Sequence, residues 1–115
     1  MKRIKRVYNP ASREDGYRIL VDRLWPRGMP QDNAQIDLCS KDVSPSNDMQ
    51  QWFSHDSQKW QGFKKHYENE LKDKQEVLHK IKHAEKEKRT VTLLYSARDE
   101  EHNQAVALLA FLQKT

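Results

Sequence analysis

Charged and aromatic side chains are concentrated in one short loop near the start of the chain. The loop spans residues 22–28 and contains Asp22, Arg23, Trp25 and Arg27. Arginine binds carboxylate or phosphate through two parallel hydrogen bonds, and an indole ring offers a flat face for stacking. The loop therefore has the residue types of a site for an anionic ligand. The alternative is structural, with Asp22 paired to an arginine and Trp25 covering the core.

A second polar segment, residues 96–103, follows the apolar run at residues 90–95. Its side chains are Ser96, Ala97, Arg98, Asp99, Glu100, Glu101, His102 and Asn103. The pattern predicts that a helix begins here, and a helix N-terminus favours an anion, to which Ser96 could donate and with which Arg98 could pair. Ordinary capping is the alternative, because Ser96 and Asp99 have the spacing of a capping box.

An enzyme would also need a group that exchanges protons in the site. The candidates are Asp22, His55 and His102, whose pKa values neighbouring arginines could shift. The chain contains no Ser-His-Asp order, no GxSxG, no phosphate-binding P-loop and no GxGxxG. His79 and His83 are four residues apart but have no carboxylate as a third ligand, so we predict no metal site and no cofactor.

These side chains need a scaffold, and the apolar pattern predicts one of the α/β class. Residues 18–22 and 90–96 carry uninterrupted apolar runs, which are typical of strands covered on both faces in a parallel sheet. Residues 4–8 predict a further strand, residues 58–71 a helix whose apolar face continues to about residue 88, and residues 99–113 a last helix. Since ligands bind at the carboxyl ends of such strands, the two polar loops should share one site.

Length and composition restrict the class of protein. The 115 residues suit a single α/β domain, residues 1–115, with a mainly parallel sheet flanked by helices. No apolar stretch approaches the roughly 20 residues of a membrane span. The single cysteine, Cys39, excludes an internal disulfide and suits a reducing cytoplasm. The net charge of +4 is compatible with an anionic ligand but is too small to demonstrate a nucleic-acid partner.

A nucleic-acid- or protein-binding module is the competing functional class. It would use the same arginines with Trp25 and the basic segment 72–89, which holds seven basic and four acidic residues. The opposite charges are interleaved at helical spacing, and this is typical of a solvated helix face. We also expect the aromatic residues Trp52, Trp60, Phe63 and Tyr67 to pack in the core, because they share helical stripes.

The order of these segments resembles the domain-of-unknown-function 488 family, in its short YeaO-like branch. The similar stretches are Gly-Tyr-Arg-Ile-Leu-Val-Asp-Arg-Leu-Trp-Pro-Arg-Gly at 16–28, Lys-Asp-Val-Ser-Pro-Ser at 41–46, Trp-Phe-Ser-His-Asp at 52–56 and Leu-Leu-Tyr-Ser-Ala at 93–97. The matching motif positions include Asp22, Arg23, Trp25, Arg27, His55, Tyr95 and Ser96. The resemblance implies a bacterial, cytoplasmic α/β domain with no established activity.

This chain departs from the family pattern at three places. Relatives carry Asn-His-Ala in the last helix, where this chain has Asn103, Gln104 and Ala105 with its histidine at position 102. A tryptophan is usual at the position of Cys39, and a proline at that of Ser57. The first difference puts an essential histidine in that helix in doubt.

The sequence thus favours a small anionic ligand bound at the carboxyl edge of the sheet, with or without catalysis. The predicted ligand-binding residues are Arg23, Trp25, Arg27, Tyr95, Ser96, Arg98 and Asn103. Asp22 is predicted to orient an arginine. The oligomeric state and the identity of the ligand are left open.

Overall fold

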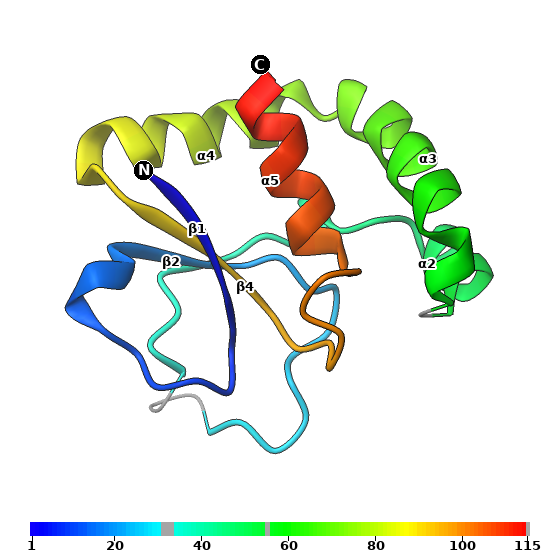
Figure 1. The fold of residues 1–115 in the computed structure, drawn as a ribbon. Helices are drawn as coiled ribbons and strands as arrows, with labels where there is room; N and C mark the ends of the chain where they lie inside the picture. The colour runs from blue at the N-terminus through cyan, green and yellow to red at the C-terminus, as the bar shows by residue number, and fades with distance from the viewer. Residues whose placement is uncertain (31–33, 55, 115) are drawn as a thin grey trace.

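A computed structural model describes residues 1–30, 34–54 and 56–114 of the chain. Its sheet consists of β1 (Lys2–Arg6), β2 (Tyr17–Leu20), β3 (Leu38–Cys39) and β4 (Val91–Tyr95). The strands lie in the order β1-β4-β2-β3, and every pair is parallel (Figure 1). The uninterrupted apolar runs are therefore strands, and β4 is buried along its whole length, as a central parallel strand requires.

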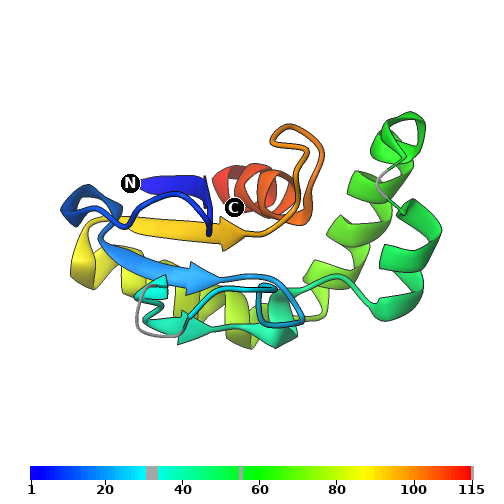
Figure 2. The same cartoon turned by 90° about the horizontal axis from the view of Figure 1, so that it is seen from below.

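Helices cover both faces of this sheet and one of its ends. The longer helices are α2 (Asn47–Phe53), α3 (Trp60–Lys72), α4 (Gln75–Lys88) and α5 (Gln104–Lys114). Figure 2 shows α5 on one face and α4 on the opposite face, whereas α2 and α3 stand beyond the carboxyl ends of the strands. Short 3₁₀ turns lie at Arg13–Asp15, Lys41–Val43 and Ser57–Lys59. The predicted α/β class and mainly parallel sheet are confirmed.

The predicted helix beyond residue 58 is broken where we expected its apolar face to continue. α3 ends at Lys72 and α4 begins at Gln75. A straight helix over residues 60–88 would be about 43 Å long, which exceeds the 35 Å longest dimension of the molecule. The break lets the apolar residues of α4 turn onto the sheet, while those of α3 pack beyond the strand ends.

The last helix begins later than the predicted residue 99. Asn103 is its cap, since its Oδ1 accepts from the backbone N–H of Val106 at 3.1 Å. Asp99 instead accepts from the N–H groups of Glu101 and His102 in the preceding loop, at 2.9 and 3.0 Å. Residues 96–103 are therefore a loop, which we call the acidic loop. The predicted start of the helix at residue 99 was wrong because Asp99 caps a turn that does not continue.

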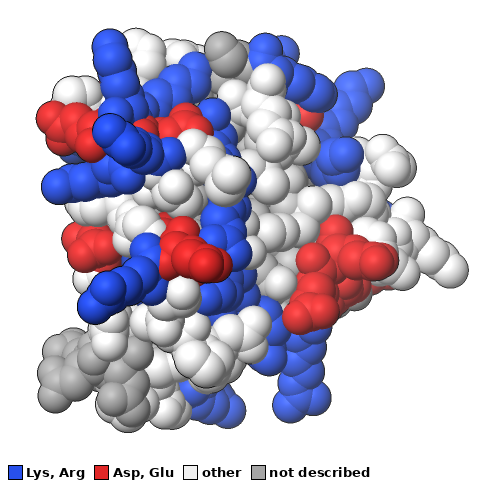
Figure 3. Space-filling model, turned by 60° about the vertical axis from the view of Figure 1, so that its left-hand side comes forward, with Lys and Arg blue, Asp and Glu red and all other residues white. Residues whose placement is uncertain are grey.

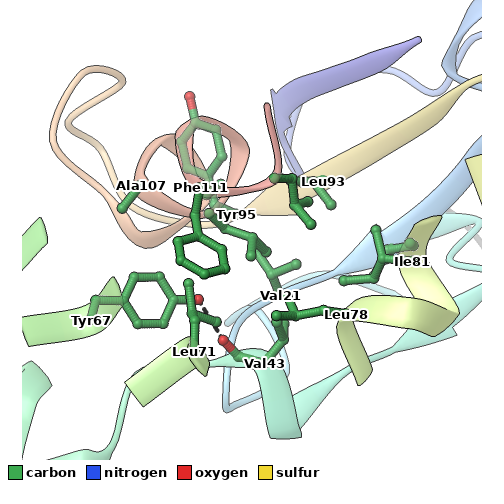
Figure 4. Packing of buried hydrophobic residues seen from close by; sticks show 14 of the residues in the cluster. Val21, Val43, Tyr67, Leu71, Leu78, Ile81, Leu93, Tyr95, Ala107 and Phe111 are labelled. Carbon is green, nitrogen blue, oxygen red and sulfur yellow. Dashed lines mark hydrogen bonds between the residues drawn. The ribbon is translucent and has the colours of Figure 1, made fainter. Parts of the chain in front are cut away.

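The core lies between the sheet and the helices. Figure 4 shows residues of β4, α3, α4 and α5 packed together, with the buried Tyr67 hydroxyl donating to the carbonyl of Val43 at 2.5 Å. Burial, followed by the nearby Glu70, raises the pKa of Tyr67, so its hydroxyl stays protonated and can donate. Phe63 is also buried. These two aromatic residues confirm the predicted core packing.

The other two predicted core aromatics differ from each other. Trp60 is partly buried against the core, as predicted. Trp52 is 43% exposed, so its prediction was wrong. Its ring lies against α3, where it meets His66 edge-on with the ring centroids 5.9 Å apart and where a Cβ at Gly62 would lie 3.0 Å from it. The ammonium group of Lys59 lies 5.3 Å from the ring.

A buried charge network fixes the opposite end of the sheet. The fully buried Asp15 accepts from Lys5 at 2.8 Å, from the N–H of Ser12 at 3.0 Å and from Arg18 at 2.5 Å. Burial by itself raises the pKa of Asp15, but hydrogen bonds from Lys5, Ser12 and Arg18 together hold it below its ordinary value. The network thus has a structural role, away from the strand ends that carry the two polar loops.

Candidate functional site

The parallel pairing of β2 with β4 places the two polar loops side by side. Leu20 is the register partner of Leu94, and the N–H of Val21 donates to the carbonyl of Leu94 at 3.1 Å. Residues 22–28, which we call the arginine loop, therefore leave the sheet next to Ser96. The shared edge predicted from the sequence is what the strand order produces.

A cleft of about 490 Å³ opens between this edge and helices α2 and α3. The arginine loop contributes Asp22, Arg23, Leu24, Trp25, Pro26 and Arg27, and the acidic loop contributes Ser96 and Ala97. The remaining lining residues are Tyr8, Pro45, Asn47, Gln50, Phe53, Phe63 and Gln104. Of the predicted ligand-binding residues, Arg23, Trp25, Arg27 and Ser96 are thus brought to one concavity.

Asp22 joins the two loops and the start of α5. Its carboxylate accepts from the N–H of Ser96 at 3.0 Å, from the Ser96 hydroxyl at 2.5 Å and from the side-chain amide of Gln104. The residue is only 8% exposed. The donors to this carboxylate therefore include a serine and a glutamine, and its predicted pairing with an arginine stays a prediction. A carboxylate engaged in this way holds the cleft together.

The two cleft arginines have no counter-charge among the described residues. Arg23 and Arg27 are both exposed, and neither guanidinium forms an ion pair or a hydrogen bond with another described residue. A third cation lies nearby. Burial lowers the pKa of Lys74, Glu70 raises it, and the positive charge of Arg23 contributes to lowering it. Asp42 also contributes to raising that pKa, so acidic and basic groups are mixed around Lys74.

The arginine loop is held by bonds that leave its arginines available. The indole N–H of Trp25 donates to the carbonyl of Met29 at 2.8 Å, and the hydroxyl of Tyr8 donates to the carbonyl of Arg27 at 2.8 Å. Trp25 is 39% exposed and belongs to the cleft wall. The structural alternative for Trp25, in which it covers the core, was therefore wrong.

The other predicted site residues do not line the cleft. Tyr95 is buried, and burial, followed by the charge of Glu100, raises its pKa. Asn103 caps α5 and donates to the carbonyl of Asp99 at 2.9 Å. Arg98 is exposed on the acidic loop. None of these three side chains is among the residues that line the cavity.

His102, a candidate proton-exchanging group, is engaged outside the cleft. Its Nδ1 lies 2.9 Å from Asp99, and its ring meets Trp60 edge-on at 5.2 Å. The backbone N–H of Glu101, then the His102 side chain, hold the pKa of Asp99 below its ordinary value. The pair ties the acidic loop to α3. His55, the remaining candidate, lies outside the described residues.

Several residues that shape the cleft were not identified from the sequence. Arg6 donates to the carbonyls of Ala97 and Ser96 at 3.0 and 3.3 Å, and its guanidinium lies 5.1 Å from the ring of Tyr8. Gln104 was named in the sequence analysis only as a departure from the family pattern, and its bond to Asp22 was not predicted. Nothing in the sequence indicates that Arg6 of β1 or Gln104 of α5 contacts these loops, because the contacts arise only in the folded chain.

The described ranges also bear on metal binding and on membrane insertion. No group of three or more His, Cys, Asp or Glu side chains there is arranged to hold a metal ion. No helix in those ranges has the length and apolar character needed to cross a membrane.

Comparison with known proteins places this architecture among uncharacterised relatives. The family description that matches residues 1–115 reads "Inactive DUF488-N3 subclade". The uncharacterised protein YeaO of Escherichia coli (strain K12) is 38% identical over 109 residues, covering 95% of this chain and 94% of that protein. An uncharacterised protein of Mycobacterium tuberculosis (strain ATCC 25618 / H37Rv) is 38% identical over 71 residues, which cover 62% of this chain and 60% of the relative. No solved structure matches the chain with significance.

Proposed function

Given that this chain belongs to the DUF488 family, in the subclade described as inactive, we propose that it binds a small anionic ligand in the cleft without converting it. The ligand lies at the carboxyl edge of the sheet, between the arginine loop and helices α2 and α3. Arg23 and Arg27 supply the positive charge, and the Ser96 hydroxyl and the cleft amides supply polar contacts.

One observation carries this proposal: Arg23, Arg27 and Ser96 line a single concave cleft in which neither guanidinium has an ionic partner among the described residues. Two positive charges in a partly enclosed site repel each other, and a bound anion relieves that repulsion. Guanidinium groups also match the planar geometry of carboxylate and phosphate. The concave shape favours a small ligand over an extended polymer.

Binding without catalysis agrees with the state of Asp22 and His102, the two candidate proton-exchanging groups among the described residues. Asp22 accepts hydrogen bonds from Ser96 and Gln104, and His102 is bonded to Asp99 away from the cleft. General acid–base catalysis needs a group within hydrogen-bonding reach of the reacting atom. The family description "inactive" supports the same interpretation.

The alternative of a nucleic-acid- or protein-binding module receives less support. It relied on the basic segment that contains α4, where Glu85 pairs with Lys2 at 2.8 Å and Glu87 with His83 at 3.2 Å. On the face drawn in Figure 3, acidic and basic side chains are interspersed. A polyanion is attracted by a continuous basic surface, which that face does not offer.

The test is calorimetric titration of phosphate and small dicarboxylates at constant ionic strength, with melting temperature as a second readout. Wild type is compared with Arg27→Ala and with Arg13→Ala, which removes the same charge from the opposite end of the sheet. We expect binding to wild type and Arg13→Ala and a loss of at least tenfold in Arg27→Ala. At a ligand concentration of 100 Kd, binding should stabilise wild type by about 2.7 kcal/mol. Equal binding by all three proteins, or by none, would contradict an anion site at Arg27.

A further inference from the structure

The cleft is larger than an inorganic anion, and its aromatic and amide residues indicate what else the ligand contains besides its anionic group. We propose that the ligand is a planar heterocycle joined to an anionic group, of the class represented by nucleoside monophosphates. This inference rests on the anion site proposed above and assigns the remaining parts of the same cleft to the heterocycle.

The size of the cleft points to an organic ligand. Its volume of about 490 Å³ lies within the range of pockets that hold drug-sized molecules. An inorganic phosphate has only five heavy atoms and would leave most of that space to water. A ligand that fills the cleft must therefore carry a substantial body beside its charge.

The apolar walls of the cleft suit a flat ring. Trp25 lies at its border, 39% exposed, with its N–H already bonded to Met29 at 2.8 Å. Since an indole has no second polar group, Trp25 can offer a ligand only the ring itself. Phe53 and Phe63 stack on each other at 4.4 Å and also line the cavity. Phe53 and Phe63 are only 4% and 2% exposed, so they form an apolar wall, and Trp25 is the ring on which a planar group could stack.

The amides of the cleft provide hydrogen-bond acceptors for the edge of such a ring. The Nε2 group of Gln50 donates to the carbonyl of Pro45 at 3.3 Å, and that of Gln104 donates to Asp22. Each Nε2 carries two hydrogens, of which one is engaged, so both amides retain a second N–H, which donates, and a carbonyl oxygen, which accepts. Asn47, on the first turn of α2, adds a third amide to the lining. Acceptors of this kind complement the ring N–H and amino groups of a nucleobase.

The charged and amide groups come from different elements, so one ligand must span them. The arginines belong to the loop after β2, whereas Asn47 and Gln50 belong to α2 and Gln104 to α5. A molecule with an anion at one end and a hydrogen-bonding ring at the other meets both sets. An unsubstituted dicarboxylate would meet only the arginines.

The test measures affinity for the four ribonucleoside monophosphates AMP, GMP, CMP and UMP, with ribose 5-phosphate, adenosine and inorganic phosphate as the matched partial ligands. We expect at least one monophosphate to bind wild type about tenfold or more tightly than ribose 5-phosphate. Trp25→Leu should remove that advantage, measured as the ratio of the two affinities, while Trp25→Phe, which keeps a ring, should restore part of it. Both variants lose the bond to Met29, so each serves as the control for the loosening of the loop in the other. Arg27→Ala should weaken every phosphate-bearing ligand and leave adenosine unaffected.

The failures of the two proposals are distinguishable. If phosphate and ribose 5-phosphate bind through Arg27 but no monophosphate binds better, the ligand class is overturned and the anion site stands. The ligand class is also overturned if Trp25→Leu, folded by circular dichroism, keeps the full advantage of the monophosphate. If adenosine binds as well as AMP and Arg27→Ala changes neither, the anion site is overturned. If no probe binds wild type, both proposals fail.

Discussion

Replacing Asp22 by alanine should destabilise the fold, because this carboxylate connects the ends of β2 and β4 to the start of α5. It accepts from the N–H and the hydroxyl of Ser96 and from the amide of Gln104. A hydrogen bond to a charged group contributes about 1.5–3 kcal/mol. The backbone N–H of Ser96 has no freedom to turn to water, whereas the two side-chain donors can do so in a partly open cleft.

The expected loss is therefore about 2–4 kcal/mol, nearer to one or two such bonds than to the sum of three. For a chain of this length, 1 kcal/mol corresponds to about 4 °C in Tm, so Tm should fall by about 8–16 °C. Urea unfolding followed by circular dichroism gives the free energy, and calorimetry gives Tm. The matched control is Asp42→Ala, which removes an exposed carboxylate and should change stability by less than about 0.5 kcal/mol.

A double-mutant cycle separates the proposed bonds from a general effect of the charge. Asp22→Ala combined with Ser96→Ala should be less destabilising than the sum of the single changes, by about 1 kcal/mol. Additive effects, or a stability of Asp22→Ala within 0.5 kcal/mol of wild type, would refute this account. Asp22 would then not be needed to hold the fold and could act as a proton-exchanging group, and catalysis in the cleft would become the better interpretation.

The remaining predictions concern the backbone and the charge network around the sheet. Gly16→Ala should cost about 2–3 kcal/mol or more in urea unfolding, because its φ is +63° and a Cβ there would lie 2.3 Å from the Thr90 carbonyl oxygen. Gly28→Ala, with φ +75° and nothing within 4 Å, should cost only about 1–2 kcal/mol, and equal losses would contradict the contact. The pKa of Asp15 is lower in the folded chain than its ordinary value of 3.8. The ionised carboxylate therefore stabilises the fold above pH 3.8, and this contribution is lost as the pH falls through the lowered pKa. Asp15→Asn should therefore lose about 3–5 kcal/mol of stability at pH 7. Its stability should also decline less steeply between pH 5 and 3 than that of wild type, and parallel declines would refute the lowered pKa of Asp15. Tyr8→Phe removes the hydroxyl that bonds the arginine loop and should lose about 0.5–1.5 kcal/mol in the same measurement, whereas an unchanged stability would mean that this bond is not formed in solution.

Local patterns were sufficient for most of the secondary structure. The apolar runs before the arginine loop and before Ser96 are β2 and β4. The start of α2 is also local, since the Ser46 hydroxyl accepts from the N–H of Met49 at 3.2 Å. These features depend on residues within a few positions of one another. The late start of α5 is also a local matter, because Asp99 accepts from the N–H groups of Glu101 and His102 in a separate turn and Asn103 caps the helix.

The candidate site could be predicted only to the level of its two loops. Residue types identified Arg23, Trp25, Arg27 and Ser96, and the rule for parallel sheets brought them to one edge. The same reasoning included Tyr95, Arg98 and Asn103, which are not among the residues that line the cavity. It omitted Gln50, Phe53 and Phe63, because helical stripes of apolar residues indicate burial and do not indicate which buried ring also lines a cavity.

The sequence by itself determined the buried strands β2 and β4 and the chemical character of the arginine loop, since each of these follows from neighbouring residues. The strand order, the break between α3 and α4 and the bonds of Asp22 were decided by the tertiary structure. The residues that donate to Asp22, Ser96 and Gln104, are 74 and 82 positions away from it in the chain. Contacts at that separation form only when β4 is inserted between β1 and β2, so no pattern of neighbouring residues specifies them. For this reason the sequence predicted an anion-binding loop, while the cleft that makes it a binding site arises from the fold.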